Sequence, residues 1–332
     1  MDNALVTIQN LSVVYTLKAG LSGLFKKRKG RTVKAVNDLS LSLEKGEILS
    51  LVGESGSGKT TTGRALLRLI KEEVKGTIRF EGKDVFSLSK QELKGFRKKA
   101  QMIFQDPYQA LNPRNTVSRI VGESLEIHHP DFSWEKKQAM IAEALEWCGL
   151  KPVERYWNRY PHELSGGQRQ RVAIAGALIL KPQLVVADEP VSMLDASVRL
   201  DILSLLNGLK EEIGVTCLFI THDLALAWLI SNRIAVMFAG TLVELGSAGL
   251  IAEGALHPYS KALIAAQPSA TSSKERKRVI QVERKEDPAA VVFCPYYRRC
   301  MQATERCGKE LPPLSEINPN HFVRCFNCRP NS

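Results

Sequence analysis

The sequence predicts an α/β fold built on a parallel sheet whose two faces are both buried. In the second half of the chain, helix-forming segments at 167–180 and 198–212 alternate with apolar runs at 184–187 and 215–220. Apolar strands of four to six residues between helices are typical of parallel sheets that helices cover on both faces. A second observation is the apolar run at 48–52, which leads through a glycine-rich loop into a helix-forming segment.

Length and composition set the class of protein. The chain has 332 residues, of which 44% are hydrophobic and 24% are charged. This is the balance of a globular protein of about two domains rather than of a disordered chain. The longest apolar run, 172–180, is about half as long as a membrane-spanning helix. Residues 1–15 lack the pattern of a secretory signal. We therefore expect a soluble chain in the cytosol.

The charge balance is strongly basic. Lysine and arginine number 46 against 35 acidic residues, which gives a net charge of +11. Such an excess favours the binding of polyanions such as nucleotides, nucleic acid and anionic membrane surfaces, but it does not indicate which of them is bound. Basic runs at 26–29 and 274–278 supply part of the excess. We expect both runs to be solvated loops.

Shifts in composition divide the chain into regions. Residues 106–164 are helix-rich and are interrupted by five prolines, whereas 269–290 are rich in Ser, Lys, Arg and Glu, the composition of a linker. We expect a large unit over 1–265, with the helical region at 106–164, and a linker with a cysteine-rich extension over 266–332.

A strand, a glycine-rich loop and a helix follow one another between residues 48 and 70. The strand at 48–52 leads into Gly-Glu-Ser-Gly-Ser-Gly-Lys-Thr, a Walker A loop, and the helix is expected at 61–70. Glycines let successive backbone N–H groups turn toward phosphate oxygens at the positive end of the helix. Lys59 should reach the β- and γ-phosphates, and Thr60 should bind Mg²⁺. The predicted nucleotide-binding residues here are Gly53, Glu54, Ser55, Gly56, Ser57, Gly58, Lys59, Thr60 and Thr61.

Two carboxylates follow the apolar strand at 184–187. Ligands of open α/β sheets bind at the carboxyl ends of the strands, where Asp188 and Glu189 stand. Asp188 is suited to hold Mg²⁺ through its water shell, and Glu189 is suited to polarise an attacking water. An Asp-Glu pair is weak evidence by itself, but it becomes strong evidence in a chain that has a Walker A loop.

A second anion cradle is predicted where the helix at 167–180 begins. Ser165, Gly166, Gly167 and Gln168 place a hydroxyl and exposed N–H groups at its N-terminus. One nucleotide needs only one cradle. This stretch resembles the signature of ATP-binding-cassette (ABC) ATPases, and the resemblance covers about residues 5 to 265. It implies a P-loop NTPase with a RecA-like core, an antiparallel β subdomain and a helical subdomain. It also implies head-to-tail pairing, in which one subunit's signature caps the ATP of the other.

The resemblance assigns further positions. Gln105 is similar to the Q-loop glutamine, which senses Mg²⁺ and the membrane partner. Asp195 is similar to the D-loop aspartate that crosses the dimer interface, although Met193 replaces the commoner alanine. His222 is similar to the switch histidine at the γ-phosphate, and Tyr15 stands where the family stacks an aromatic ring on adenine. A structural histidine and a core tyrosine are the competing interpretations for the last two.

Because the catalytic positions are all occupied, the sequence predicts Mg²⁺-dependent ATP hydrolysis with Glu189 as general base and with Gln105 and His222 assisting. The alternative is a structural subunit with an inactive site. The intact Lys59, Glu189 and His222 argue against that alternative.

The segment at 104–114 narrows the family. It reads Phe-Gln-Asp-Pro-Tyr-Gln-Ala-Leu-Asn-Pro-Arg and resembles the F-type ATPase subunit of oligopeptide and dipeptide permeases, although Ala110 replaces the usual serine. Segments 189–192 and 257–260 are similar to the same subunits. The resemblance implies a peripheral subunit at the cytoplasmic face that energises peptide import. Its partners would be two membrane permease subunits, a second homologous ATPase subunit and an extracytoplasmic binding protein. Related importers carry oligosaccharides or nickel, so these two remain alternative cargoes.

Cysteines cluster at the end of the chain. Cys148 and Cys217 stand in apolar surroundings and are expected in the core. The remaining five point to metal before disulfide in a cytosolic chain. Cys294, Cys300, Cys307 and Cys325 are spaced as in the extension of the same permease subunits, which carries a 4Fe-4S cluster; Cys328 is a fifth thiol. Tetrahedral zinc and free thiols are the alternatives.

A rival interpretation is a soluble ABC ATPase that acts on nucleic acid or ribosomes, which the charge of +11 would suit. Such proteins usually have two cassettes or a dedicated nucleic-acid module, and this chain has one cassette. We therefore expect no nucleic-acid partner.

Overall fold

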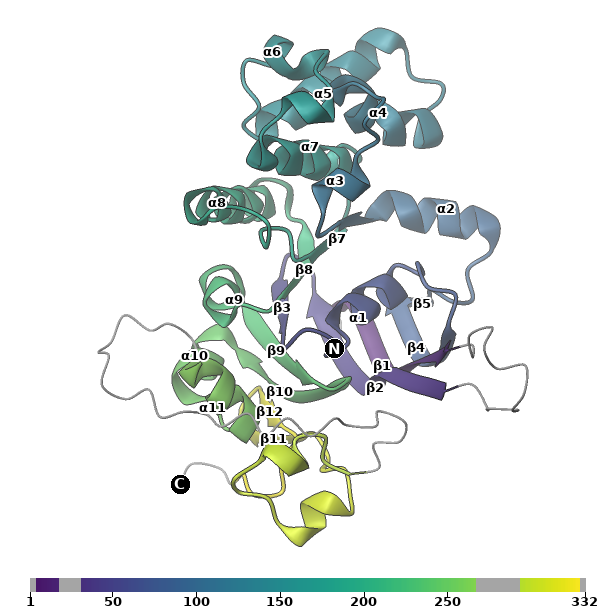
Figure 1. Ribbon diagram of the computed structural model, residues 1–332. Coiled ribbons are helices and arrows are strands. Elements are labelled where there is room, and N and C mark those ends of the chain that lie inside the picture. Colours follow the sequence, from purple (N-terminus) through teal and green to yellow (C-terminus); the bar gives the residue numbers. More distant parts are fainter. Residues whose placement is uncertain (1–3, 18–30, 267–292, 329–332) are drawn as a thin grey trace, which may run out of the picture. The chain divides into compact units, whose positions relative to one another are not determined.

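The computed structural model describes residues 4–17, 31–266 and 293–328, and these form two compact units (Figure 1). The first unit comprises residues 4–5, 43–48 and 87–220, and the second comprises the other described residues. The basic runs at 26–29 and 274–278, and the expected linker at 269–290, lie outside the described residues. None of the described helices combines the length and apolar content that a membrane span requires.

The first unit contains three parallel strands in the order β8-β7-β6. These are β6 (Ala100–Ile103), β7 (Leu184–Asp188) and β8 (Thr216–Thr221). β6 pairs with β7 and β7 pairs with β8, both in parallel register. Every residue of β7 and β8 is buried, which is what a parallel sheet covered on both faces requires. The predicted parallel strands are therefore confirmed.

Two long helices of this unit were expected from the alternating pattern. α7 (Gly166–Leu178) and α8 (Ala196–Ile213) match the predicted segments within two residues. α8 ends at Gly214, whose φ of 66° is the left-handed conformation that glycine adopts at helix ends. Cys148 and Cys217 are both in the core, as predicted, and burial raises the pKa of each thiol to about 12.

Further helices of the first unit lie in the region that the prolines interrupt, at the top of Figure 1. α4 packs closely on α5: a Cβ added to Gly122 would lie 2.8 Å from Cδ1 of Ile141. Their buried faces carry Val121 and Leu125 on α4 and Leu145 on α5. These helices are α3 (Pro107–Ala110), α4 (Val117–His128), α5 (Trp134–Trp147) and α6 (Glu154–Trp157), with a 3-10 turn at Pro161–Glu163. The helix α2 (Lys90–Lys99) precedes this region.

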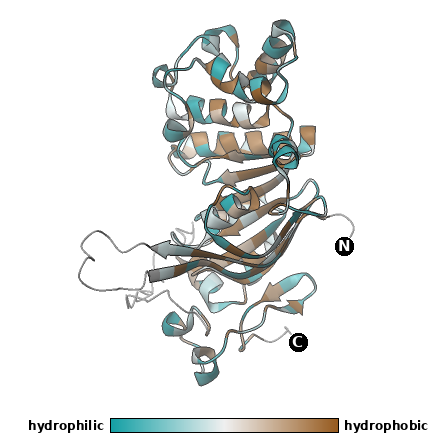
Figure 2. Cartoon of the chain, turned by 90° about the vertical axis from the view of Figure 1, so that its right-hand side faces the viewer, coloured by the Kyte–Doolittle hydropathy of each residue, from teal (hydrophilic) through white to brown (hydrophobic). Residues whose placement is uncertain are grey.

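The second unit contains two sheets. In one, the strand order is β2-β1-β4-β5, and β1 runs antiparallel to β4 with a bulge between Gln9 and Ser12. This is the antiparallel subdomain that the resemblance implied. Its strands are β1 (Ala4–Leu17), β2 (Arg31–Glu44), β4 (Glu73–Phe80) and β5 (Lys83–Asp84). In Figure 2 the strands of the protein are mainly brown, whereas the helices carry both colours.

The other sheet of the second unit includes strands from the cysteine-rich extension. β3 (Ile48–Val52) is parallel to β9 (Arg233–Phe238), and β10 (Thr241–Ser247) is antiparallel to β9. β12 (His321–Val323) then pairs with β10, and β11 (Ser315–Asn318) pairs with β12. The sequence did not predict these last two strands, because three or four residues are too few for a periodic pattern.

The helices of the second unit include the one that follows the glycine-rich loop. α1 (Lys59–Leu66) begins two residues before the predicted segment and ends four residues before its end, since Arg68 takes a left-handed φ of 51°. The others are α9 (Leu224–Ile230), α10 (Ala248–Gly254) and α11 (Pro258–Ala265), with 3-10 turns at Tyr297–Arg299 and Glu305–Gly308. Cys294, Tyr296 and Cys307 belong to the same hydrophobic core as Phe238. The extension therefore packs into the core of this unit.

Candidate nucleotide-binding site

The Walker A loop joins β3 to α1 in a conformation that needs its glycines. Gly58 has a φ of 98°, and a Cβ at this position would lie 2.3 Å from the carbonyl oxygen of Ala35. Ser57 accepts a hydrogen bond through its carbonyl from the backbone N–H of Gly240 at 3.0 Å. The neighbouring turn of the sheet therefore holds the loop in place.

Lys59 lies inside the loop that it belongs to. Its side chain is 4% exposed, and Nζ donates to the carbonyl oxygens of Gly53 at 2.7 Å and Glu54 at 2.9 Å. A buried ammonium group held by backbone carbonyls fits the role of an anion-binding cation, because a phosphate oxygen is a stronger acceptor than a carbonyl. Thr60 and Thr61, in the first turn of α1, are half-buried.

Asp188 and Glu189 lie where the sequence placed them, at the carboxyl end of β7. Asp188 is 2% exposed. Glu189 takes a left-handed φ of 44°, and its N–H donates to the carbonyl oxygen of Ile220 at 2.9 Å. A residue other than glycine in this conformation stores strain, which is common at functional sites.

The structure brings Gln105 to Glu189. Nε2 of Gln105 donates to Oε2 of Glu189 at 3.1 Å, although the two residues are 84 positions apart. Gln105 follows β6 and Glu189 follows β7, and these parallel neighbours end at the same edge of the sheet. Two of the three predicted catalytic residues therefore touch each other.

The predicted second cradle is a capped helix N-terminus. Oγ of Ser165 accepts from the backbone N–H of Gln168 at 3.3 Å, and Oε1 of Gln168 accepts from the N–H of Ser165 at 3.0 Å. This reciprocal pair is a capping box. A Cβ added to Gly167 would lie 2.6 Å from Cγ1 of Val198 in α8, and one added to Gly166 would be 3.6 Å from Leu194. The signature and the start of α8 are therefore in close contact.

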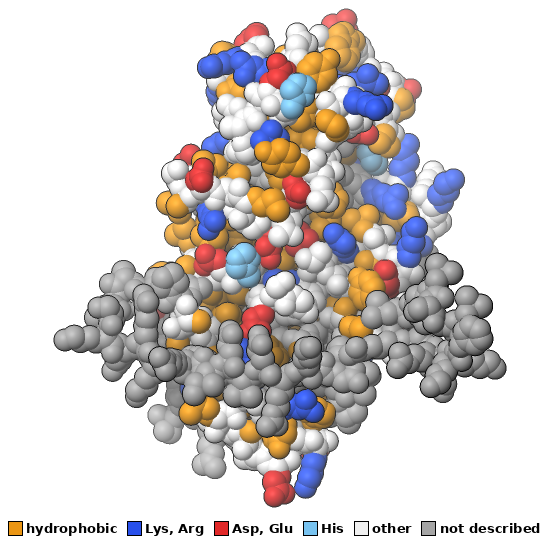
Figure 3. All heavy atoms as spheres, viewed as in Figure 1, with side chains coloured by type: hydrophobic (Ala, Val, Ile, Leu, Met, Phe, Trp, Pro, Cys, Tyr) orange, Lys and Arg blue, Asp and Glu red, His pale blue; other side chains and the backbone are white. Residues whose placement is uncertain are grey.

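The remaining predicted positions are placed as follows. Asp195 is the exposed N-cap residue of α8, and Met193 is 60% exposed. His222 is exposed directly after β8. Tyr15 is half-buried in β1, which decides neither of its two interpretations. Figure 3 shows basic and acidic side chains interspersed on the surface, with hydrophobic side chains between them.

The four cysteines predicted as ligands are all free thiols in the described part of the extension. The N–H of Cys294 donates to the carbonyl oxygen of Cys307 at 3.0 Å. Burial raises the pKa of Cys294 to about 11, and the neighbouring thiols of Cys307, Cys300 and Cys325 add to that rise. Cys328 forms a hydrogen bond with Cys325 that lowers the pKa of Cys325. Within the described ranges, however, no group of three or more His, Cys, Asp and Glu side chains could hold a metal ion.

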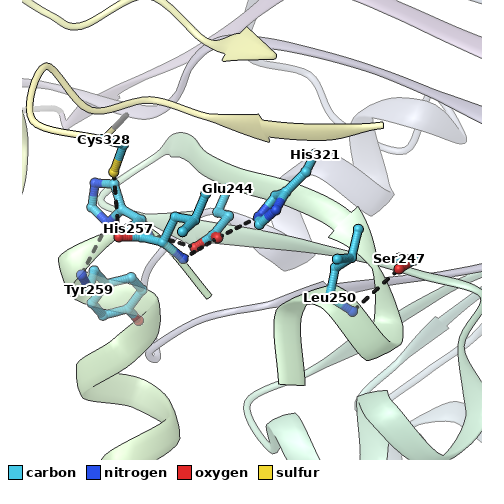
Figure 4. Close-up of polar contacts among 8 residues, drawn as sticks. Glu244, Ser247, Leu250, His257, Tyr259, His321 and Cys328 are labelled. Atoms are coloured by element: carbon cyan, nitrogen blue, oxygen red, sulfur yellow. Dashed lines mark hydrogen bonds and ion pairs between the residues drawn. The ribbon is translucent and has the colours of Figure 1, made fainter. Parts of the chain in front are cut away.

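A buried acid, which sequence reasoning missed, fastens the extension to β10. Glu244 is fully buried and accepts from Nε2 of His321 at 2.7 Å, and from the N–H groups of Leu256 at 2.7 Å and His257 at 3.1 Å (Figure 4). Burial alone would raise the pKa of Glu244, but these hydrogen bonds outweigh it and lower the pKa. The only signal in the sequence that could have indicated this contact is that His321, the partner of Glu244, lies four residues before Cys325.

A tyrosine that sequence reasoning did not assign touches the Walker A loop. The hydroxyl of Tyr259 accepts from the backbone N–H of Glu54 at 3.0 Å. Tyr259 belongs to the segment 257–260 that suggested the permease resemblance. Part of that motif therefore supports the nucleotide loop.

Known families match both parts of the chain. A family described as "ABC transporter" matches residues 36–192, and one described as "Oligopeptide/dipeptide transporter, C-terminal region" matches residues 243–307. The chain is 44% identical over 304 residues to the putative oligopeptide transport ATP-binding protein YkfD of Bacillus subtilis, covering 91% of this chain and 92% of that protein. It is 41% identical to OppF of Haemophilus influenzae, an oligopeptide transport ATP-binding protein, covering 97% and 96%. The chain is an ATP-binding subunit of the oligopeptide/dipeptide ABC transporter family.

Solved structures agree with the fold of this ABC subunit. The dimeric ATP-binding cassette MJ0796, in a post-hydrolysis state bound to ADP and Pi, superimposes with a TM-score of 0.63 at 31% identity. That match covers 73% of this chain and 98% of MJ0796. The predicted P-loop ABC fold is confirmed, and the ABC subunit is an ATPase.

Proposed function

We propose that this ABC subunit hydrolyses ATP to drive the import of dipeptides and oligopeptides through a membrane permease. The observation that carries the proposal is the combination, in one chain, of an ABC cassette with the C-terminal region of oligopeptide/dipeptide transporters. The two relatives named above are described as oligopeptide transport ATP-binding proteins, one of them as putative, and each match covers more than nine-tenths of the relative's length.

The residues divide the chemistry as follows. Lys59 and the N–H groups of the loop bind the phosphates of ATP, and Tyr15 stacks on the adenine. Glu189 accepts a proton from the attacking water, while Gln105 holds its carboxylate in place through the 3.1 Å hydrogen bond. His222 contacts the γ-phosphate.

We also propose that Thr60 and Gln105 bind a magnesium ion and that Asp188 holds it through its water shell, since hydroxyl, amide and carboxylate oxygens are the ligands that Mg²⁺ prefers. When bound, the ion supplies positive charge that neutralises the phosphates. The buried position of Asp188 at the end of β7 agrees with such a role.

The assembly that we propose has five further features. A second homologous ATPase subunit provides the opposite signature, and Asp195 lies at that interface. Two permease subunits dock on the helical region, an extracytoplasmic protein delivers the peptide, and the subunit stays at the cytoplasmic face. Exposed Phe104 and Tyr108, at 42% and 62%, flank Gln105 and offer an apolar contact for a membrane partner.

We further propose that Cys294, Cys300, Cys307 and Cys325 bind a 4Fe-4S cluster. Four thiolates are the usual ligand set of such a cluster. We prefer the cluster over zinc because the spacing of these four cysteines is not the Cys-x-x-Cys pair repeat of common zinc ribbons. Iron and acid-labile sulfide in anaerobically purified protein test this proposal. Stoichiometric zinc without iron would contradict it, and Cys307→Ser should lower the iron content, whereas Cys148→Ser should not.

Cargo and partners are tested together. The tagged subunit is isolated from detergent-solubilised membranes, its partners are identified by mass spectrometry, and the complex is reconstituted into vesicles with ATP. We expect permease partners and ATP-dependent uptake of peptide. Uptake of an oligosaccharide or of nickel in place of peptide would contradict the proposal that the cargo is a peptide. Co-isolation of ribosomes or nucleic acid without a permease would favour the soluble alternative.

A further inference from the structure

An arginine from the cysteine-rich extension is bound to the Walker A loop. Nη1 of Arg299 lies 3.0 Å from Oε2 of Glu54, and Nη2 lies 2.9 Å from Oε1. The two side chains therefore form a two-point fork, the geometry that favours an arginine over a lysine. The residues are 245 positions apart and lie in the same compact unit.

The guanidinium of Arg299 also contacts two aromatic rings. Its Cζ lies 5.2 Å from the centre of the Phe238 ring and 5.6 Å from that of Tyr296. These are cation–π distances. The backbone N–H of Arg299 donates to the carbonyl oxygen of Tyr296 at 3.0 Å, which fixes the short turn. Because Glu54 raises the pKa of Arg299 further, the guanidinium stays charged.

Glu54 is held through its backbone as well as its side chain. Its N–H donates to the hydroxyl of Tyr259, and its carbonyl accepts from Nζ of Lys59. The Tyr259 ring lies 4.6 Å from Phe238 and 5.5 Å from Tyr296. One aromatic cluster (Phe238, Tyr259 and Tyr296) therefore supports both Arg299 and Glu54, the loop residue that Arg299 binds.

The charge of Glu54 has a consequence for nucleotide binding. Glu54 is an acid inside a loop that binds a polyanion, and an unpaired carboxylate there would repel the phosphates. Arg299 cancels that charge and also fixes the side chain to a packed turn. Because Glu54 is 44% exposed, water and salt weaken both effects, so a moderate change in affinity is expected.

We propose that Arg299 is a positioning residue for the nucleotide site: the extension neutralises and holds Glu54, so that the Walker A loop binds the phosphates with full affinity. The extension is thereby part of the nucleotide site rather than an appendage. The proposal depends on nucleotide binding alone and not on which cargo the transporter carries.

The test is a charge cycle in the full-length chain. MgADP binding is measured by titration calorimetry for Arg299→Gln, Glu54→Gln and the double variant. We expect Arg299→Gln to weaken binding about fivefold. The double variant should bind within about twofold of the parent, because it also removes the uncompensated carboxylate. The matched control is Arg298→Gln, which removes the same charge from the exposed neighbour and should leave affinity unchanged.

A kinetic measurement separates positioning from general damage. In the assembled transporter, Arg299→Gln should raise KM for ATP and leave kcat unchanged. Equal affinities for Arg299→Gln and Arg298→Gln would overturn the proposal, as would a double variant as weak as Arg299→Gln. If Arg299→Gln does not fold, Arg299→Lys keeps the charge but loses the two-point fork, and it should weaken binding by less than about fivefold. A loss of about fivefold or more in a folded Arg299→Lys protein would refute the electrostatic role.

Discussion

Gln105 donates a hydrogen bond to Glu189 across the carboxyl ends of two adjacent parallel strands, at 3.1 Å. The amide therefore holds the carboxylate that stands in a strained, left-handed backbone position at the end of β7. The contact therefore joins the residue that we propose as the general base to the residue that we propose holds its carboxylate.

Replacing Glu189 with Gln should abolish turnover and preserve nucleotide binding. The substitution removes the proton acceptor and keeps the size of the side chain, so ATPase activity should fall about 10²- to 10⁴-fold. Phosphate release and MgADP calorimetry check the two halves of this expectation. Gln105→Ala should lower kcat less, by about tenfold, since it removes one hydrogen bond. Unchanged turnover in Glu189→Gln would remove Glu189 from its role.

Gly58→Ala should disable the Walker A loop. The new Cβ would lie 2.3 Å from the carbonyl oxygen of Ala35 at a φ of 98°, so the loop must move or the chain must bear the strain. We expect a loss of about 1–3 kcal/mol in the free energy of unfolding together with loss of MgADP binding. Gly249→Ala, in open space on α10, is the control and should not destabilise the protein. Wild-type binding by Gly58→Ala would contradict the assigned geometry.

His257 should make stability depend on pH. Burial lowers the pKa of His257 from 6.5 to about 4, although nearby Glu244 opposes the shift. The unfolded chain therefore binds a proton between these values that the folded chain does not. The free energy of unfolding should decrease by about 3 kcal/mol from this group as pH falls from about 6.5 to about 4.

The variant His257→Asn isolates this contribution. Asparagine cannot titrate and can still accept the hydrogen bond that the N–H of Tyr259 donates to Nδ1 of His257 at 3.0 Å. Denaturant unfolding at several pH values should show a shallower dependence in His257→Asn than in the parent. His162→Gln, at an exposed position, is the control. Parallel curves for His257→Asn and the parent would refute the prediction.

The cysteines should differ in reactivity. Cys148 and Cys217 are buried and have pKa values raised to about 12, so the folded protein should protect both from iodoacetamide. Cys325, half-buried with a lowered pKa, should react first in protein stripped of metal. Peptide mapping by mass spectrometry, before and after denaturation, gives the order in which the cysteines react with iodoacetamide. Early labelling of Cys148 would show that its core position is wrong.

Much of the nucleotide site is determined locally and could be predicted. The strand at Ile48–Val52 has the bounds that the apolar run predicted, and Asp188 and Glu189 follow β7 as expected. The conformations of the loop, of the helix N-terminus and of the strand end depend on residues within a few positions. A local sequence pattern can therefore predict them. The resemblance then supplied the family, which the comparisons confirm.

Only the tertiary structure decided which distant groups meet. The contact between Gln105 and Glu189, the burial of His321 against Glu244 and the fork between Arg299 and Glu54 each join residues that are 77 or more positions apart. Strands β11 and β12 likewise exist because β10 offers an edge with which to pair. Such contacts are fixed by sheet order and by core packing, whose determinants are spread along the chain, so no local pattern of residues encodes them.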